Sequence, residues 1–308
     1  MQKGPPTPKG FRDLKPELAK KKRVVISKIV DVLSEFEFEP IETPTVEFAE
    51  TLKGKYGDEE KLIYEFKDRG GRDLALRYDL TVPLARYVAT YNPPLPFRRY
   101  QIGQVFRGEN PQAGRYREFT QFDFDTVGSS DLEEDAKIIA AAAKSIEALP
   151  LKNFEILIND RKLFNQLNEK GYVKDEELIS VLRSLDKIKK IGKDGVIQEL
   201  QSKGFKKEFA VAILENAQTV KKNDRIVKIF DSLKNLGVDE NKYVFAPLLA
   251  RGLDYYTSTI FEIEIKGYSG GSIGSGGRYD NLIGMFSKKE TPAVGFSFGL
   301  DRLIEALG

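Results

Sequence analysis

The sequence predicts an α+β protein, in which an antiparallel β-sheet is flanked by helices and interrupted by a helical insertion. Short segments that alternate polar and apolar residues dominate positions 61–127, and a period of two residues is typical of half-buried strands. Lysine-rich sequence with helical spacing follows from about residue 171, and strand-like sequence resumes at Tyr243. With 308 residues, 41% of them hydrophobic, the chain can form a large core and an inserted module.

The N-terminal part predicts a helix followed by an edge strand. Apolar residues recur at helical spacing between Leu18 and Leu33, which favours a helix. The next segment, PIETPTVEF (40–48), mixes β-branched residues with Pro40 and Pro44. Proline has no N–H to donate to a β-ladder, so such a strand belongs at an edge or an interface. A long helix leading into a strand of this kind predicts an element of subunit assembly.

The sheet is predicted from five further segments. They are LIYEF (62–66), RYQIGQVF (99–106), REFTQFDFDTV (117–127), NFEILIN (153–159) and FEIEI (261–265). A helix is expected over 131–149, with Asp131 as its N-terminal cap. A glycine-dense loop is expected after FEIEI, and a final helix near the end of the chain. The expected sheet has about six strands.

The insertion divides the chain into a core, residues 1–170 and 242–308, and a helical module, residues 171–241. In this module one helical face is apolar; its residues are Leu178, Val181, Leu182, Leu185 and Ile188. Gly192, Gly204 and Gly237 occupy positions where helices would end.

Two absent residue types narrow the possible chemistry. The chain has no cysteine and no histidine, which excludes disulfides, thiolate nucleophiles, Cys- or His-ligated metals and imidazole acid–base catalysis. Chemistry must therefore depend on arginine, lysine, tyrosine, carboxylates and backbone groups, a set that suits phosphoryl and nucleotidyl transfer. The net charge of +2 means that any polyanion site is local. No signal peptide and no long apolar run are evident, so we expect a cytoplasmic protein without a membrane partner.

One predicted strand and the loop before it combine polar groups in a pattern that suits a ligand. Period-two geometry puts Arg117, Phe119, Gln121, Asp123 and Asp125 on one face of the strand and two phenylalanines on the other. The polar face either borders a cleft or is an ordinary solvated sheet face. The loop RGENPQAGRYR (107–117) carries three arginines and a glutamate. Arginine forks match phosphate oxygens and a carboxylate can accept from a purine amino group, although a charged surface hairpin is the alternative.

Three segments resemble the histidyl-tRNA synthetases, a family of class II aminoacyl-tRNA synthetases. FRGENPQAGRYREFTQFDFD (106–125) is similar to motif 2, ARGLDYYTSTIFE (250–262) to the histidine-specific signature, and PAVGFSFGLDRL (292–303) to motif 3. ETPTVEF matches motif 1 more loosely, and GFRDL and LRYDLTVPLARY (76–87) are also similar to the family. The resemblance covers nearly the whole chain. A Rossmann or P-loop site is excluded, because no helix follows GSIGSGGRY (271–279) as those fingerprints require.

The resemblance implies roles for individual residues. Arg107 and Arg251 would be catalytic, both near the α-phosphate of ATP, and Arg107 would also contact the substrate carboxylate. Glu109 would bind adenine, while Arg115 and Arg302 would hold the terminal phosphates. The remaining assignments concern L-histidine: Asp79 and Thr81 at its ammonium group, Gln121, Asp125, Tyr255 and Tyr256 around its imidazole, and Gly276, Gly277 and Tyr279 lining the pocket. Leu80, Arg107 and Arg251 would also belong to the histidine-binding set. Core packing is the alternative for the tyrosines.

The resemblance further implies ATP as substrate with Mg²⁺, no protein-bound metal site, a homodimer, and transfer of histidine to the acceptor end of tRNA(His). Lysines of residues 171–240 would contact the acceptor arm or simply face solvent. The family's C-terminal anticodon-binding domain is absent from these 308 residues. Three interpretations stay open: a synthetase catalytic core, which we favour, a histidine-binding regulatory subunit of ATP phosphoribosyltransferase, and a repurposed fold such as a kinase regulator or another ligase. Such regulatory paralogues tend to lose the ATP-binding arginines and the RGLDYY motif, whereas this sequence contains the arginines and the motif.

Overall fold

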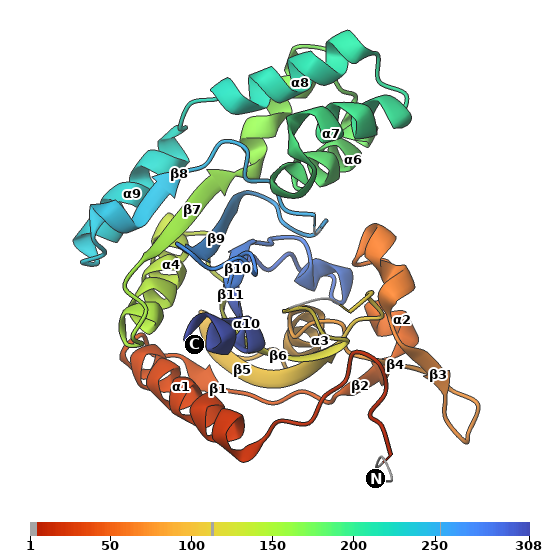
Figure 1. The fold of residues 1–308 in the computed structure, drawn as a ribbon, viewed down its shortest axis with the longest axis vertical. Helices are drawn as coiled ribbons and strands as arrows, with labels where there is room; N and C mark the ends of the chain where they lie inside the picture. Colours follow the sequence, from red (N-terminus) through yellow and green to blue (C-terminus); the bar gives the residue numbers. More distant parts are fainter. Residues whose placement is uncertain (1–4, 112–113, 253) are drawn as a thin grey trace.

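An eight-stranded sheet runs through the centre of the molecule (Figure 1). The computed structural model describes residues 5–111, 114–252 and 254–308. The strands lie in the order β1 (Glu39–Pro40), β5 (Phe97–Phe106), β6 (Glu118–Val127), β11 (Ala293–Gly299), β10 (Gly274–Arg278), β9 (Thr259–Ile265), β7 (Phe154–Asp160) and β8 (Tyr243–Phe245). Neighbours from β5 to β7 are antiparallel. The predicted antiparallel sheet is confirmed for these six strands, while the short edge strands β1 and β8 pair in parallel.

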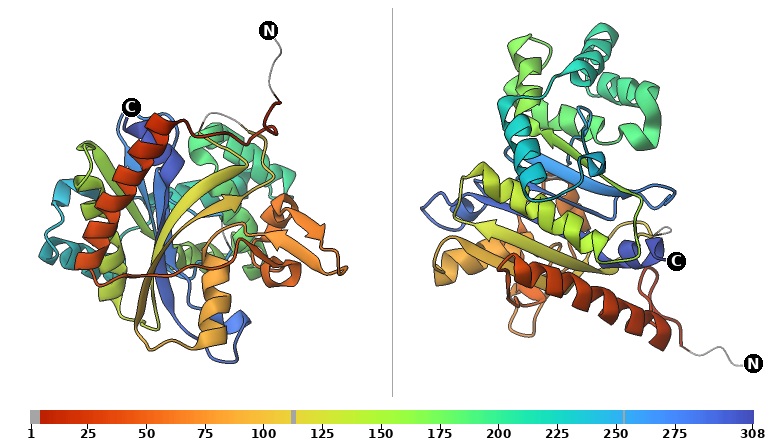
Figure 2. Two further views of the ribbon diagram at one scale, coloured as in Figure 1. Left: turned by 90° about the horizontal axis from the view of Figure 1, so that it is seen from below. Right: turned by 90° about the vertical axis from the view of Figure 1, so that its left-hand side faces the viewer.

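Helices cover one face of this sheet and form the main hydrophobic core with it. They are α1 (Pro16–Glu35), α4 (Leu132–Glu147), α9 (Asp224–Asn235) and α10 (Leu300–Ala306). Figure 2 shows α1 and α4 side by side across the sheet. The expected cap of α4 is present, because the Asp131 carboxylate accepts the backbone N–H of Glu133 at 3.0 Å. Phe122 and Phe124 of β6 lie in this core, so the aromatic face of β6 is the buried one.

A second, three-stranded sheet lies beside the first. Its strands are β2 (Val46–Phe48), β4 (Asp73–Leu76) and β3 (Glu65–Lys67). With α2 (Ala49–Leu52), η1 (Gly57–Leu62), α3 (Thr81–Tyr91) and η4 (Ile283–Met285), it forms a smaller core. The segment 40–48, predicted as one strand, contributes β1 and β2 to different sheets. The strand predicted at 62–66 begins only at Glu65, because the chain up to Leu62 is a 3₁₀ turn.

The inserted region is helical, and it contributes to two cores. The short helices η2 (Arg161–Asn165) and α5 (Gln166–Glu169) lead into α6 (Asp175–Leu185), α7 (Ile188–Ser202) and α8 (Lys207–Thr219), which enclose a core of their own. Helix α9 instead packs on α4 in the main core, and η3 (Glu240–Lys242) then leads to β8. Within the range 171–241, α6, α7 and α8 therefore share a core that is separate from the one to which α9 contributes. No helix among the described residues is long and apolar enough to cross a membrane.

The expected glycine-dense loop after β9 covers residues 266–273, and the glycines that follow it belong to the central strand β10. A Cβ on Gly276 would lie 2.1 Å from the Gly295 carbonyl oxygen, and one on Gly277 would lie 2.6 Å from that of Thr259. The glycines are therefore required by close approach of neighbouring strands, a use of glycine that strand propensity alone does not indicate.

Candidate active site

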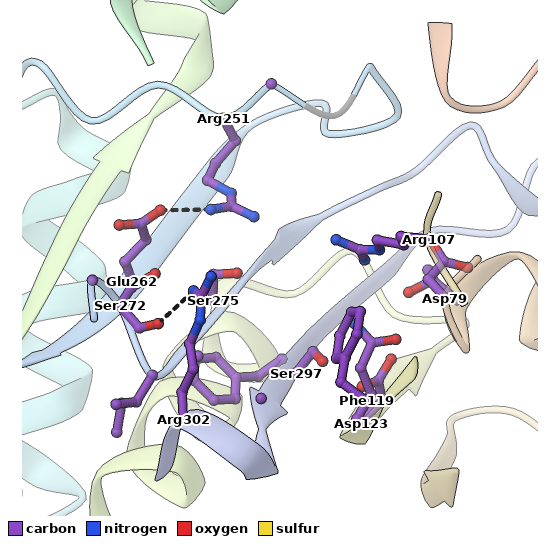
Figure 3. Close-up of a pocket in the computed structure, with 18 of the residues that line it drawn as sticks. Asp79, Arg107, Phe119, Asp123, Arg251, Glu262, Ser272, Ser275, Ser297 and Arg302 are labelled. Atoms are coloured by element: carbon purple, nitrogen blue, oxygen red, sulfur yellow. Dashed lines mark hydrogen bonds and ion pairs between the residues drawn. The ribbon is translucent and has the colours of Figure 1, made fainter. Parts of the chain in front are cut away.

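The polar face of β6 forms one wall of a cavity of about 380 Å³ on the side of the sheet away from α1 and α4. Other walls come from β10, β11, the loop after β5, the start of α3 and the loop that carries Arg251. Figure 3 shows Arg107 and Arg251 pointing into this space from two different sides, with Asp79 close to Arg107. The cavity thus has arginines and carboxylates facing a shared interior.

Asp79 supplies a buried carboxylate oxygen at one end of the cavity. Its Oδ1 accepts the hydroxyl of Tyr56 at 2.9 Å and the backbone N–H of Val82 at 3.0 Å. Its Oδ2 is buried and has no hydrogen-bond partner among the described residues. Burial raises the pKa of Asp79. An unsatisfied buried oxygen is costly, so this geometry suits a cationic group that donates to it.

Asp125 and Gln121 lie on the same face of β6, as the period of two predicts. Tyr279 donates its hydroxyl to Asp125 Oδ1 at 2.5 Å, and the Arg99 guanidinium lies 2.7 Å from Oδ2. Gln121 Oε1 is buried and has no hydrogen-bond partner within the described part of the chain. This wall therefore offers a fixed carboxylate that can accept from a ring N–H and an amide that can accept from, or donate to, a second ring nitrogen.

Asp123 lies between these residues on β6. Burial raises the pKa of Asp123 to about 7, and the Asp125 charge acts in the same direction, while Arg99 opposes both. Arg99 is completely buried. Arg99 lies on the neighbouring strand β5, opposite Asp125, and its charge therefore stabilises a polar wall that carries two buried carboxylates.

Arg107 and Arg251 are held by different means. The Arg107 guanidinium lies over the Tyr78 ring, 4.3 Å from its centroid, and its Nε donates to the Tyr78 carbonyl at 3.2 Å. Arg251 Nη1 donates to Glu262 Oε1 at 2.5 Å, whereas its buried Nε has no hydrogen-bond partner among the described residues. Both side chains are fixed on one side and keep donors for an anion.

A second pair of arginines lies at the mouth of the cavity, near the start of α10. Arg115 Nη1 donates to Glu109 Oε2 at 3.3 Å. Arg302 donates to the backbone carbonyls of Gly114 at 3.2 Å and Ser272 at 3.1 Å. Burial lowers the pKa of Arg302, and the nearby positive charge of Arg115 acts in the same direction. Two cations this close favour a bound polyanion.

Comparison with known proteins assigns the family. The model of the family described as "Histidyl-tRNA synthetase" matches residues 10–303. The chain belongs to the histidyl-tRNA synthetase family. A protein named histidine–tRNA ligase from Aeropyrum pernix is 42% identical, over 98% of this chain and 74% of its own length. Another of that name from Helicobacter acinonychis is 44% identical, over 98% and 75%.

Solved structures agree with this assignment. The crystal structure of histidyl-tRNA synthetase from Nostoc sp. PCC 7120 is similar with a TM-score of 0.84 and 31% identity, covering 99% of this chain and 76% of that one. A structure titled ATP phosphoribosyltransferase regulatory subunit/histidyl-tRNA synthetase, from Bacillus halodurans, has a TM-score of 0.82 at 24% identity, covering 100% and 84%. At that identity the second likeness concerns the fold alone.

Most residues that the family resemblance singles out do line the cavity. They are Asp79, Thr81, Arg107, Glu109, Arg115, Gln121, Asp125, Arg251, Tyr255, Tyr256, Tyr279 and Arg302. Leu80, Gly276 and Gly277 are not among the residues that line the cavity. Leu80 is fully buried at the start of α3. Gly277 affects the site indirectly, because the absence of a Cβ there leaves room for the Tyr256 ring. Gln112, Ala113 and Leu253 lie outside the described residues.

Several lining residues had no sequence assignment. Glu59, Asp186 and Glu262 approach from η1, α6 and β9, and Ser297 from β11. A signal existed for Glu262, because alternation in FEIEI separates its glutamates from its apolar residues. Glu59 and Asp186 are brought in by long-range packing. No group of three or more carboxylates among the described residues could hold a metal ion.

Proposed function

We propose that this chain activates L-histidine with ATP, forming histidyl-adenylate and pyrophosphate, and then transfers the histidyl group to the 3′ end of tRNA(His). The family supports this, since its curated relatives are named histidine–tRNA ligases. The observation that carries it is one cavity with a carboxylate and amide wall on β6 and four arginines around the same space. A histidine-binding regulatory subunit would need the carboxylate and amide wall but not the four arginines.

The amino-acid end of the site would bind histidine through its two polar ends. Asp79 Oδ2 would accept the α-ammonium group, with Thr81 beside it, because Tyr56 and Val82 already occupy the other oxygen. Asp125 would accept from one imidazole N–H; the Gln121 amide would accept from the second nitrogen of a protonated ring through Oε1, or donate to that nitrogen in a neutral ring through its amide N–H. Tyr255 and Tyr256, whose ring centroids are 4.9 Å apart, would enclose the ring. An analogue without ring nitrogens would leave these buried acceptors unpaired and bind weakly.

The chemical step needs positioning and charge stabilisation more than proton transfer. The histidine carboxylate is ionised at neutral pH, so it can attack the α-phosphorus directly; an oxygen–phosphorus bond forms and the bond to the pyrophosphate oxygen breaks. Arg107 and Arg251, which enter the cavity from two different sides, would stabilise the charge on the α-phosphate oxygens. Arg115 and Arg302 would hold the leaving pyrophosphate, and Glu109 would accept from adenine. Such fixed donors in a buried site require no rearrangement during reaction.

Mg²⁺ fits this site as a companion of the nucleotide. Mg²⁺ commonly binds through one or two carboxylates together with substrate phosphates, and the described residues form no three-carboxylate cage. Glu262, beside Arg251, would supply a protein oxygen. Bound there, the ion would neutralise phosphate charge. The residue roles derived above do not depend on it.

We also propose a homodimer, as the motif 1 resemblance implies. Val46, Phe48 and Phe66 of the three-stranded sheet are 38%, 50% and 43% exposed, which is an unusual cluster for a solvated face. Light scattering after gel filtration would give a mass near twice that of one chain, and a monomer mass at micromolar concentration would contradict this. The cytoplasmic location expected from the sequence stays a prediction.

Histidine-dependent exchange of pyrophosphate into ATP tests the proposed activity. We expect exchange with histidine and none above background with phenylalanine or glutamine. Tight histidine binding without exchange would instead support the regulatory-subunit alternative. Calorimetric titration of histidine into the same preparation distinguishes that outcome from an inactive protein.

A further inference from the structure

Helix α6 of the inserted region contacts both sides of the amino-acid site through one arginine. Arg183 Nε and Nη2 donate to the two carboxylate oxygens of Asp254, at 3.3 and 2.6 Å. Its third nitrogen, Nη1, pairs with Asp58 of η1. Arg183 and Asp254 are only 22% and 26% exposed. A bidentate and partly buried ion pair is both stronger and more directional than a surface pair.

The two carboxylates that Arg183 contacts precede residues of the cavity wall. Asp254 is followed by Tyr255 and Tyr256, the proposed imidazole enclosure. Asp58 is followed by Glu59, which accepts the hydroxyl of Tyr78, and Tyr78 in turn supports the Arg107 guanidinium. One guanidinium therefore joins α6 to both walls.

Two further features show that α6 is fitted closely against these walls. Gly57 has a φ of +57°, and a Cβ there would lie 2.1 Å from Arg183 Nη2 and 2.4 Å from Asp254 Oδ2, so the chain before Asp58 approaches the ion pair where only glycine fits. At the end of α6, the Asp186 carboxylate accepts the backbone N–H of Gly252, next to Arg251. Helix α6 thus contacts the Arg251 loop at two points.

Helix α6 is a rigid base for these contacts. Val181, Leu182 and Leu185, on its other face, are buried in the core shared with α7 and α8. Arg183 is therefore fixed to a packed module, while Asp254 lies in a turn and Asp58 on the short 3₁₀ helix η1. An ion pair in this arrangement orders these two segments rather than α6.

We propose that Arg183 is a positioning residue for the amino-acid site. It holds the wall that carries Tyr255 and the wall that carries Glu59 at the distance from each other that encloses histidine. This role rests on the proposed function for its substrate. It gives the inserted region a part in histidine binding, although α6 contributes few groups to the cavity itself. Because Arg161 also lies near enough to interact with the Asp254 charge, loss of Arg183 would weaken the closure without abolishing it.

The variants Arg183→Met and Arg183→Lys test this role, with Lys187→Met as the matched control. Lys187 lies in the same region and pairs with Glu199, which is also inside the insertion. We expect Arg183→Met to raise the histidine Kd by roughly tenfold, the loss of about one good charged hydrogen bond. Arg183→Lys, which can contact one carboxylate but not two in the same fork, should give an intermediate value. The KM for ATP should rise less than the histidine Kd in Arg183→Met and Arg183→Lys, and Lys187→Met should change neither quantity.

A purely structural role would lower the melting temperature and the active fraction and leave the histidine Kd of the folded protein unchanged. That result, or an equal rise in Kd in Lys187→Met, would overturn the proposal. If Arg183→Met does not fold, Asp254→Asn removes the other partner of the pair and should show the same rise. Where both singles fold, the double variant should bind histidine no more weakly than either single.

Calorimetric Kd values separate this inference from the proposed activity. If the unmodified chain binds histidine without pyrophosphate exchange, the activity is wrong and the variants still test the positioning role. If the unmodified chain exchanges and Arg183→Met matches it in histidine Kd, only the positioning role fails.

Discussion

Replacing Gly295 with alanine places a methyl group directly against the carboxylate proposed to bind the imidazole. Gly295 on β11 pairs with Asp125 on β6, and a Cβ there would lie 1.8 Å from Asp125 Oδ1 and 2.4 Å from its Cγ. The carboxylate has little freedom to move, because Arg99 and Tyr279 hold it at 2.7 and 2.5 Å. Both strands also have neighbours on each side, so the backbone cannot easily separate.

The expected cost has two parts. Overpacking of a close-packed interior lowers the free energy of unfolding by about 1–3 kcal/mol. Displacement of Asp125 removes one hydrogen bond to a charged group, about 1.5–3 kcal/mol, which corresponds to a histidine Kd about 10- to 150-fold higher.

Urea denaturation and calorimetric titration measure these two quantities separately. Gly284→Ala is the matched control, since the nearest atoms to a Cβ there are 3.8 Å away, and it should change neither. An unchanged histidine Kd in folded Gly295→Ala would refute the assignment of Asp125 to the imidazole.

Three further substitutions are expected to change three different quantities: the rate of pyrophosphate exchange, the pH dependence of stability and the free energy of unfolding. Arg251→Ala should lower the rate of pyrophosphate exchange by about 10²–10³ and leave histidine binding measurable by calorimetry; unchanged exchange would contradict its role. Burial raises the pKa of Asp123 to about 7, so the folded state binds a proton that the unfolded state has lost, and stability from this group is lost as pH rises from about 4 to about 7. Urea midpoints should therefore fall less over that range in Asp123→Asn, and an equal fall would count against the shift. Arg278→Met should lower the free energy of unfolding by about 3 kcal/mol, because it removes the main ion-pair partner of the fully buried Asp135 and leaves only the longer contact with Arg225 at 3.5 Å; a melting temperature equal to that of the unmodified protein would argue otherwise.

Local patterns in the sequence predict the parts of the site that a single strand carries. Alternation on β6 correctly separates Phe122 and Phe124, which enter the core, from Gln121 and Asp125, which face the cavity. The cap at Asp131 is likewise a local feature and is present. Such features depend on neighbours a few residues away, so periodicity and capping rules reach them.

Other parts of the fold depend on contacts that local patterns do not encode. The glycines of β10 belong to a strand because β9 and β11 approach too closely for side chains, whereas glycine density by itself favours a loop. Helix α9 has the amphipathic pattern of its inserted neighbours, but its apolar face is buried against α4. Nothing local distinguishes one partner from the other.

The roles of the arginines came from the family resemblance and could not come from their residue type. Arginine-rich loops are common on surfaces, and only the fold brings Arg107, Arg251 and Arg302 to one cavity. Arg183, by contrast, has a role that neither the family resemblance nor a local pattern predicts. It lies on the lysine-rich insertion with no motif around it, and its contact with Asp254 spans distant parts of the chain.

Formation of the adenylate tests the central claim most directly. The chain is mixed with labelled ATP, histidine and inorganic pyrophosphatase, and the product is resolved by rapid quenching. We predict a burst of histidyl-adenylate that approaches one equivalent per chain and requires histidine. Saturable histidine binding with no adenylate at any time would contradict the account.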